Sequence, residues 1–236
     1  MKNILAFIPA RIGSQGIKKK NLEKIGELCL YEIPILQAKK SKYINHILLS
    51  TDGDEIKKGA NKYNINIVDR PEQFKYDNTI QEVDNLMIHS LKEYEKKLDI
   101  SIDIMVLLYP TGPLRTVDEI DQCIEQVLSG EFDSSLTISE DHSYLWAIDK
   151  NSQTTLPTNY KPEERGPRQK ESWNQYIENK AVYAFNTKML VSTGCRIGKK
   201  CGYIIMDKMS SIDIDGQEDL ELARIIVKNK FKKLDV

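Results

Sequence analysis

A glycine-containing loop with several cations follows the first apolar run of the chain. The run Asn3–Ile8 leads into Arg11, Gly13 and Gly16, and the lysines Lys18–Lys20 come directly afterwards. Glycine lets backbone amides approach phosphate oxygens, and arginine and lysine side chains offset phosphate charge. The loop therefore indicates a phosphate-binding site, although a surface turn with solvated lysines has the same composition. Its spacing differs from the dinucleotide-binding and ATPase phosphate loops.

A second loop, with restricted backbone freedom, follows a later apolar run. Ile102–Leu108 leads into Tyr109–Arg115, where Pro110 and Pro113 each fix a backbone dihedral angle. Ligands of open α/β sheets bind outside the carboxyl ends of the strands, and both loops are expected at such ends. Arg70 follows another predicted strand and adds a cation to the same edge.

Two carboxylates stand close together near the end of the chain. Asp213 and Asp215 are separated by one residue, so in an extended segment both side chains point the same way. A pair of this kind can share a hard cation such as Mg²⁺. Asp215 also precedes a predicted helix, and capping of that helix is the alternative role.

The elements that must position these residues alternate between short β-rich runs and helical periods. Strands are predicted at Asn3–Ile8, Ile44–Ser50, Ile65–Asp69, Ile102–Leu108, Ser134–Ser139, Ala181–Phe185 and Gly202–Met206. Helices are predicted at Asp52–Tyr63, Ile80–Lys97, Val117–Leu128 and Gln217–Phe231. This alternation predicts an α/β fold, a three-layer Rossmann-like domain whose mostly parallel sheet has helices on both faces.

One long segment interrupts the alternation. Asp141–Glu178 is polar, contains three prolines and carries a charged run from Lys161 to Lys170. Irregular insertions of this length are functional lids, dimerisation arms or disordered segments. We therefore expect a single domain over residues 1–236, with an inserted dimerisation or lid arm at 141–180.

Composition excludes several classes of protein. Lys and Arg total 34 and Asp and Glu total 35, a net charge of −1 that argues against general nucleic-acid or membrane-surface binding. The apolar runs are far shorter than the roughly 20 residues that span a bilayer, and no signal peptide is evident. The four cysteines and three histidines show no zinc-binding spacing. We expect a cytoplasmic protein with reduced thiols.

In their order and spacing, eight motifs of the chain resemble those of the bacterial acylneuraminate cytidylyltransferases, which include the CMP-sialic, legionaminic and pseudaminic acid synthetases. The motifs are IPARIGSQG…KKKN, STD, DRP, YDNT, LLYPTGPLR, PRQ, YIENKAVYAF and SIDIDGQEDL, and the resemblance extends from Ile4 to about Ala223. It implies transfer of CMP from CTP to the anomeric hydroxyl of a nine-carbon 2-keto sugar acid, with release of pyrophosphate and with Mg²⁺ as cofactor. It also implies a homodimer, in which the inserted arm crosses to the partner.

The resemblance further implies roles for individual residues. The CTP-binding residues would be Arg11, Ser14, Lys20, Asn21, Arg70 and Thr79. The sugar acid would contact Tyr109, Thr111, Arg115, Gln169 and Tyr183. Asp213 and Asp215 would hold Mg²⁺, and together with Arg11 and Lys20 they would form the catalytic group. A hydroxyl attacks the α-phosphorus in line with departing pyrophosphate, so such a site must mainly position the reactants and neutralise charge.

Several positions depart from the pattern of the family. Ile12 replaces a glycine in the first loop, and a β-branched residue does not tolerate a positive φ as glycine does. Tyr109 replaces a glutamine and Lys180 replaces a glycine, both on the sugar side. Alternatives are therefore a cytidylyltransferase for 3-deoxy-octulosonate or a phosphonate, and a degenerate nucleotide-binding protein in which Ile12 disables the loop. Retention of both the cation and the carboxylate clusters argues against the degenerate protein.

Overall fold

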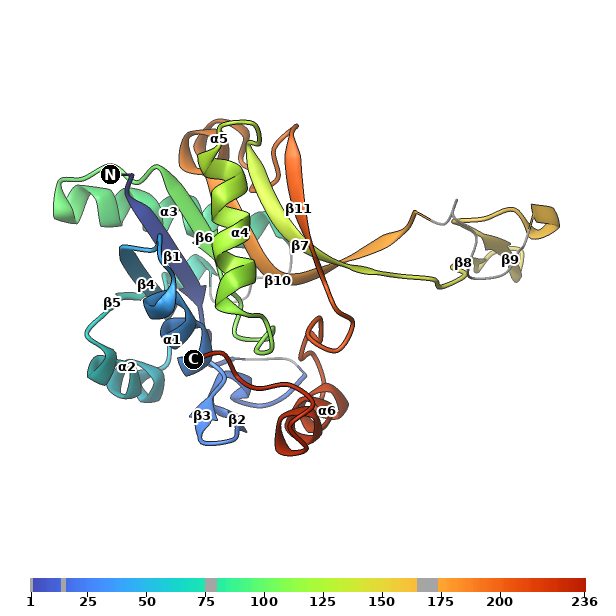
Figure 1. Cartoon of the computed structure of the whole chain (residues 1–236), viewed down its shortest axis with the longest axis horizontal. Coiled ribbons are helices and arrows are strands. Elements are labelled where there is room, and N and C mark those ends of the chain that lie inside the picture. Colours follow the sequence, from blue (N-terminus) through green and yellow to red (C-terminus); the bar gives the residue numbers. More distant parts are fainter. Residues whose placement is uncertain (1, 14–15, 75–79, 165–173) are drawn as a thin grey trace.

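A mixed sheet forms the centre of the protein. The computed structural model describes residues 2–13, 16–74, 80–164 and 174–236. The main sheet comprises β1 (Ile4–Pro9), β4 (His46–Thr51), β5 (Asn66–Asp69), β6 (Ile104–Leu107), β7 (Ser134–Glu140), β10 (Tyr176–Asn186) and β11 (Cys201–Met206). Its strand order is β11-β7-β10-β6-β1-β4-β5 (Figure 1). All neighbours are parallel except β10, which runs antiparallel to both β6 and β7. The predicted mostly parallel sheet is confirmed.

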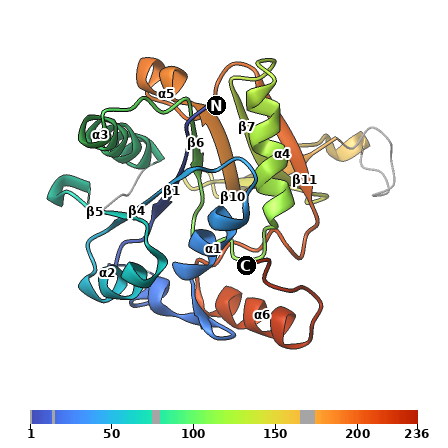
Figure 2. The same ribbon diagram turned by 60° about the vertical axis from the view of Figure 1, so that its left-hand side comes forward.

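Helices cover both faces of this sheet. They are α1 (Glu32–Lys40), α2 (Asp54–Ala60), α3 (Ile80–Leu98), α4 (Val117–Leu128), α5 (Thr187–Thr193) and α6 (Gln217–Lys228). Successive side chains of a strand point to opposite faces. In β1, Ile4, Ala6 and Ile8 therefore pack with α1, α2 and α4, whereas Leu5 and Phe7 pack with α3 and α5. Figure 2 shows α3 and α5 on one side of the sheet and α4 on the other, which confirms the three-layer arrangement.

The inserted segment contains more regular structure than the sequence predicts. Strands β7 and β10 extend beyond the domain and lead to an antiparallel hairpin of β8 (Trp146–Asp149) and β9 (Thr154–Pro157) (Figure 1). The predicted strand Ala181–Phe185 is only the second half of β10. All four residues of β8 are exposed. None of residues 142–164, the described part of the arm beyond β7, is buried. An isolated two-stranded hairpin of this kind is marginally stable in water.

A small third cluster holds the segment between β11 and α6. Ile214 is fully buried with Leu220 of α6 and with Ile25, which belongs to a short hairpin of β2 (Lys24–Ile25) and β3 (Leu28–Cys29). The Ile214 amide also donates to the Thr111 carbonyl at 2.9 Å. Burial of Ile214 therefore fixes its two acidic neighbours next to the loop after β6.

Two further expectations concern membranes and thiols. No helix of the described residues is both long enough and apolar enough to cross a bilayer. All four cysteines are free, and burial raises the pKa of the Cys123 thiol in α4 to about 12. At neutral pH this thiol stays protonated and packs as an apolar group.

Candidate active site

A cleft opens at the carboxyl ends of β1 and β6, where ligands of open α/β sheets bind. Its volume is about 400 Å³. Four segments distant in sequence line it: the loop after β1, the loop after β6, a position in β10 and the segment before α6. The lining residues are Pro9, Arg11, Gly16, Lys20, Asn21, Tyr109, Pro110, Thr111, Lys180, Asp213 and Asp215.

The structure brings seven of the predicted site residues together in this cleft: Arg11, Lys20, Asn21, Tyr109, Thr111, Asp213 and Asp215. Three others, Ser14, Thr79 and Gln169, lie outside the described residues. The remaining three, Arg70, Arg115 and Tyr183, do not line the cleft. Residues predicted from widely separated motifs thus converge on one cleft. The three described residues outside it are held by contacts of their own.

The loop after β1 is held by its own polar contacts. Asn21 is buried, and its Nδ2 donates to the Arg11 carbonyl at 2.7 Å. The Lys20 ammonium donates to the Ile214 carbonyl at 2.6 Å, which joins this loop to the segment before α6. Ile12 donates its amide to Asp52 Oδ1 at 2.8 Å and is not among the described residues with a positive φ. The loop thus accommodates isoleucine without strain at this position.

Gly16 provides a close contact between two backbones of the cleft. A Cβ atom built on Gly16 would lie 2.2 Å from the Asp215 carbonyl oxygen, whereas one on Gly13 would meet nothing within 4 Å. We therefore expect Gly16→Ala to push the two segments apart and to lower kcat/KM about 10²-fold, because small displacements of catalytic groups have effects of this size. Steady-state pyrophosphate release measures the effect, with Gly13→Ala as the matched control. Near-normal activity of Gly16→Ala would show that the close approach of Gly16 to the Asp215 carbonyl does not matter for catalysis.

The two carboxylates before α6 are both close to a lysine. Lys180 Nζ lies 2.8 Å from Asp213 Oδ2 and 3.8 Å from Asp215 Oδ2. The hydrogen bond to Asp213 raises the pKa of Lys180, so its charge persists at neutral pH. The alternative role of Asp215 as a helix cap is wrong, because Asp219 Oδ2 accepts from the amides of Gly216 and Asp215 at 2.8 and 3.0 Å. The Asp215 side chain remains directed to the cleft.

The donor set of the cleft fits Mg²⁺ that arrives with a substrate. Lys180 shows that one cation can approach both carboxylates within 4 Å. Mg²⁺ is usually bound by one or two carboxylates together with substrate phosphates and water, not by an all-protein cage. Within residues 2–13, 16–74, 80–164 and 174–236, no group of three or more acidic, histidine or cysteine side chains forms such a cage. Asp213 and Asp215 therefore suit a metal ion whose other ligands come from phosphate.

Arg115 does not line the cleft, and its burial does not fit the predicted contact with the sugar acid. Its side chain is fully buried, with Nη1 donating to the carbonyls of Tyr109 and Ala181 at 2.8 Å each. Its Nε donates to Gln37 Oε1 at 2.9 Å. Burial lowers the pKa of the Arg115 guanidinium to about 9, so it stays charged at neutral pH. Arg115 acts as a brace that joins the loop after β6 to β10.

Tyr183 is likewise buried, and it packs beside Arg196, a residue that the sequence motifs do not indicate. Its ring packs edge-on against Tyr109 and lies 5.2 Å from the Arg196 guanidinium carbon. Arg196 Nη1 donates to the Tyr109 hydroxyl at 2.9 Å, and its Nε pairs with Asp84 Oδ1 at 2.6 Å. Arg196 therefore positions Tyr109. The available signal was Asp84, a charge on the apolar face of the predicted helix Ile80–Lys97.

Arg70 directly follows β5 and is not among the residues that line the cleft. It is buried, and its Nε donates to the Phe74 carbonyl at 2.7 Å. Its backbone amide donates to Thr51 at the end of β4. Arg70 therefore closes a turn in the described part of the chain, and its predicted contact with cytidine stays a prediction.

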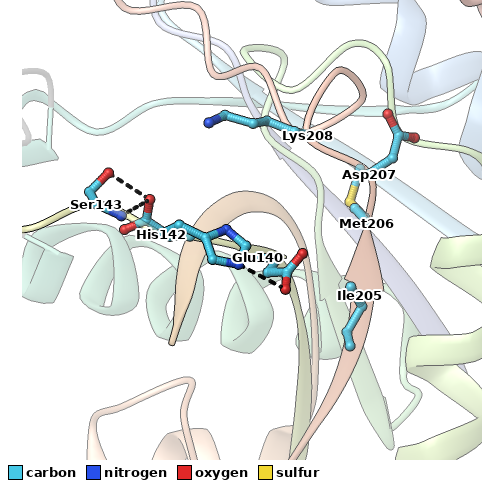
Figure 3. Close-up of a pocket in the computed structure, with 8 residues that line it drawn as sticks. Glu140, His142, Ser143, Ile205, Met206, Asp207 and Lys208 are labelled. Atoms are coloured by element: carbon cyan, nitrogen blue, oxygen red, sulfur yellow. Dashed lines mark hydrogen bonds and ion pairs between the residues drawn. The ribbon is translucent and has the colours of Figure 1, made fainter. Parts of the chain in front are cut away.

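A larger cavity, of about 610 Å³, lies where β7 and β11 end at the root of the arm (Figure 3). Its lining residues are Glu140, Asp141, His142, Ser143, Ile205, Met206, Asp207 and Lys208, none of which was predicted as a site residue. His142 Nε2 lies 3.2 Å from Glu140 Oε1, as the dashed line in Figure 3 shows. Size alone does not identify the active site, because the smaller cleft holds the convergent cations and carboxylates.

Known proteins resemble this chain over nearly its whole length. Flagellin modification protein B of Campylobacter coli is 28% identical over 98% of this chain and 97% of that protein. CMP-N,N'-diacetyllegionaminic acid synthase of Campylobacter jejuni is 26% identical, with the same coverage of both chains. The structure of a CMP:2-keto-3-deoxy-manno-octonic acid synthetase with CTP superimposes with a TM-score of 0.70 at 11% identity, covering 97% of this chain and 100% of that one. This last similarity concerns the fold alone.

A family model described as cytidylyltransferase matches residues 5–230. The match includes β1 from its second residue, both cleft loops, the arm and the acidic segment before α6. Since it covers nearly the entire domain, this chain belongs to the cytidylyltransferase family.

Proposed function

We propose that this enzyme transfers CMP from CTP to the anomeric hydroxyl of a nine-carbon 2-keto sugar acid of the sialic, legionaminic or pseudaminic type, in the cytoplasm and with Mg²⁺. The observation that carries the proposal is the convergence of Arg11, Lys20, Asp213 and Asp215 on one cleft. Cations on one side and a carboxylate pair on the other suit a triphosphate with its metal ion. The name of the Campylobacter jejuni relative, a CMP-N,N'-diacetyllegionaminic acid synthase, favours this class of acceptor.

The proposed chemistry depends mainly on charge and position. Arg11 and Lys20 would bind the triphosphate and stabilise the negative charge that develops on the departing pyrophosphate. Mg²⁺, held by Asp213 and Asp215, would add positive charge to the same phosphates. Tyr109 and Thr111, at the end of β6, would orient the acceptor hydroxyl toward the α-phosphorus. No side-chain base is assigned.

Pyrophosphate release tests this function. The purified protein is given Mg²⁺, one of the four nucleoside triphosphates and one acid from a panel of N-acetylneuraminic, legionaminic, pseudaminic and 3-deoxy-octulosonic acids and a phosphonate. The proposal expects release with CTP and a nine-carbon acid. Release with 3-deoxy-octulosonate or the phosphonate alone would support the alternative acceptors. No release and no rise of Tm with CTP would indicate a degenerate protein.

We also propose a homodimer in which the arm contacts a second copy of the chain. Large apolar side chains are exposed along the arm and the neighbouring edge strand: Leu145, Trp146, Ile148, Leu156, Tyr176, Ile177, Tyr203 and Ile205. An apolar surface of this extent is typical of an interface. Since none of the described residues 142–164 around the β8–β9 hairpin is buried, a partner surface would also stabilise the hairpin.

Light scattering after size-exclusion chromatography tests the dimer. Ile148→Glu places a charge at a side chain that is 71% exposed, and we expect this variant to elute as a monomer while the parent protein is a dimer. Leu222→Glu in α6 is the matched control, since Leu222 is 50% exposed but lies outside the arm. A monomeric parent protein, or a dimeric Ile148→Glu variant, would contradict the proposed interface.

A further inference from the structure

Lys180 enters the cleft through an irregularity of β10. The pairing of β10 with β7 shifts register between Glu178 and Tyr183. Buried Asn179 anchors this bulge, since its Oδ1 accepts from Thr137 Oγ1 at 2.6 Å and its Nδ2 donates to Ser211 Oγ at 3.0 Å. A bulge redirects a side chain, and such bulges are frequent beside active sites.

The backbone of Lys180 is unfavourable for a lysine. Its φ is +57°, in the left-handed region where glycine has no steric penalty. The side chain is half exposed, and an ion pair in that setting contributes little to stability. The fold therefore gains little from lysine over glycine at this position. The distinctive effect of lysine at this position is therefore the ammonium group that it places between Asp213 and Asp215.

We propose that the Lys180 ammonium pairs with the two carboxylates in the free enzyme. A divalent cation replaces it there only when the triphosphate binds. This inference rests on the proposed function, in which Asp213 and Asp215 are the metal ligands. A metal ion bound to these carboxylates alone would be repelled by the Lys180 ammonium, which lies 2.8 Å from Asp213 Oδ2 and 3.8 Å from Asp215 Oδ2. Repulsion between charges this close would lower the affinity for the metal ion about tenfold or more. The negative charges of a triphosphate remove this penalty.

The expected consequence concerns the order of binding. The metal ion enters with the nucleotide and is not held in its absence. Lys20 reinforces this behaviour, because its ammonium lies 3.5 Å from Asp215 Oδ1 and adds a second positive charge. After the triphosphate has bound, Lys180 is free to contact phosphate oxygens or the carboxylate of the acceptor.

Binding of Mn²⁺, followed by the electron paramagnetic resonance signal of the free ion, tests the inference without turnover. The wild-type protein should bind Mn²⁺ weakly alone, and about tenfold or more tightly with a non-hydrolysable CTP analogue, after subtraction of the Mn²⁺ that the analogue binds without protein. Lys180→Gln, which removes the charge and keeps an unbranched polar side chain, should bind Mn²⁺ about tenfold more tightly than wild type without nucleotide. Lys180→Gly should do the same and relieve the backbone, which guards against a folding defect.

Lys230→Gln is a matched control. Lys230 also has a positive φ, +60°, but it follows α6 and does not line the cleft. Its replacement should leave Mn²⁺ affinity unchanged. Equal Mn²⁺ affinity in wild type and both Lys180 variants, or no measurable binding in any of them, overturns the inference. Pyrophosphate release by the wild-type protein reports separately on the proposed function, so the two failures are distinguishable.

Discussion

Replacing Asp213 with alanine is expected to lower kcat about 10³-fold while leaving the fold intact. The change removes a carboxylate proposed to hold the metal ion, and charge stabilisation by such an ion contributes several kcal/mol to phosphoryl chemistry. Stability should fall by about 1 kcal/mol or less, because the carboxylate pairs with Lys180, whose side chain is 52% exposed. The neighbouring Ile214 stays buried in its cluster and continues to hold the segment.

Steady-state kinetics and a melting curve measure the two effects together. Asp54→Ala is the control, since it removes an exposed carboxylate that pairs with Lys57 on α2, outside the cleft. This control should keep both kcat and Tm close to the parent values. A kcat for Asp213→Ala within a factor of about 3 of the parent value, at saturating Mg²⁺, would contradict the proposed role of Asp213 as a metal ligand.

The second large effect concerns the stability of the fold. Asp84→Ala leaves the Arg196 guanidinium buried without its carboxylate, at a site where both side chains are only 3% exposed. Removing one partner of a buried ion pair costs about 3–5 kcal/mol. For a chain of this length, such a loss lowers Tm by roughly 10 °C. Burial raises the pKa of the Asp84 carboxyl although Arg196 opposes that shift, which reflects the desolvation of the pair.

A double variant separates the unpaired charge from lost packing. Asp84→Leu combined with Arg196→Met removes both charges and keeps apolar volume, so its Tm should lie well above that of Asp84→Ala. The double variant should still raise KM for the acceptor, because Tyr109 loses the Arg196 hydrogen bond that orients it. A double variant as unstable as the single one would show that packing, and not the unpaired guanidinium, determines the loss.

Much of the fold follows from patterns that lie close together in the sequence. Helix α4 begins and ends where its pattern predicts, at Val117 and Leu128, because Thr116 and Glu119 form a reciprocal capping box at its start. The pattern gives no prediction for α1, in which Pro34 reads as a helix breaker. Proline is tolerated there because it lies in the first turn, where backbone amides have no helical partner. The antiparallel direction of β10 was also not predictable, since a buried apolar run looks the same in either direction.

The candidate site also has residues that the sequence predicts and residues that it does not. The cations of the first loop and the acidic pair are predictable, since their residue types and their order along the chain are enough to indicate phosphate and metal chemistry. Burial is not predictable from a motif, so the motif places Arg115 at the substrate although its side chain is fully buried. The sequence does not indicate Arg196, because only the packing of α3 against the sheet brings its partners Asp84 and Tyr109 to it.

The most direct test of the central claim is the identity of the product. The protein is incubated with CTP, Mg²⁺ and N,N'-diacetyllegionaminic acid, and the reaction is followed by mass spectrometry and phosphorus NMR. We predict a CMP-sugar, with one phosphodiester joining the anomeric oxygen to CMP, and one equivalent of pyrophosphate. Hydrolysis of CTP to CMP without a sugar product, or no change in CTP with any acid of the panel, would contradict the assignment as a CMP-sugar synthetase.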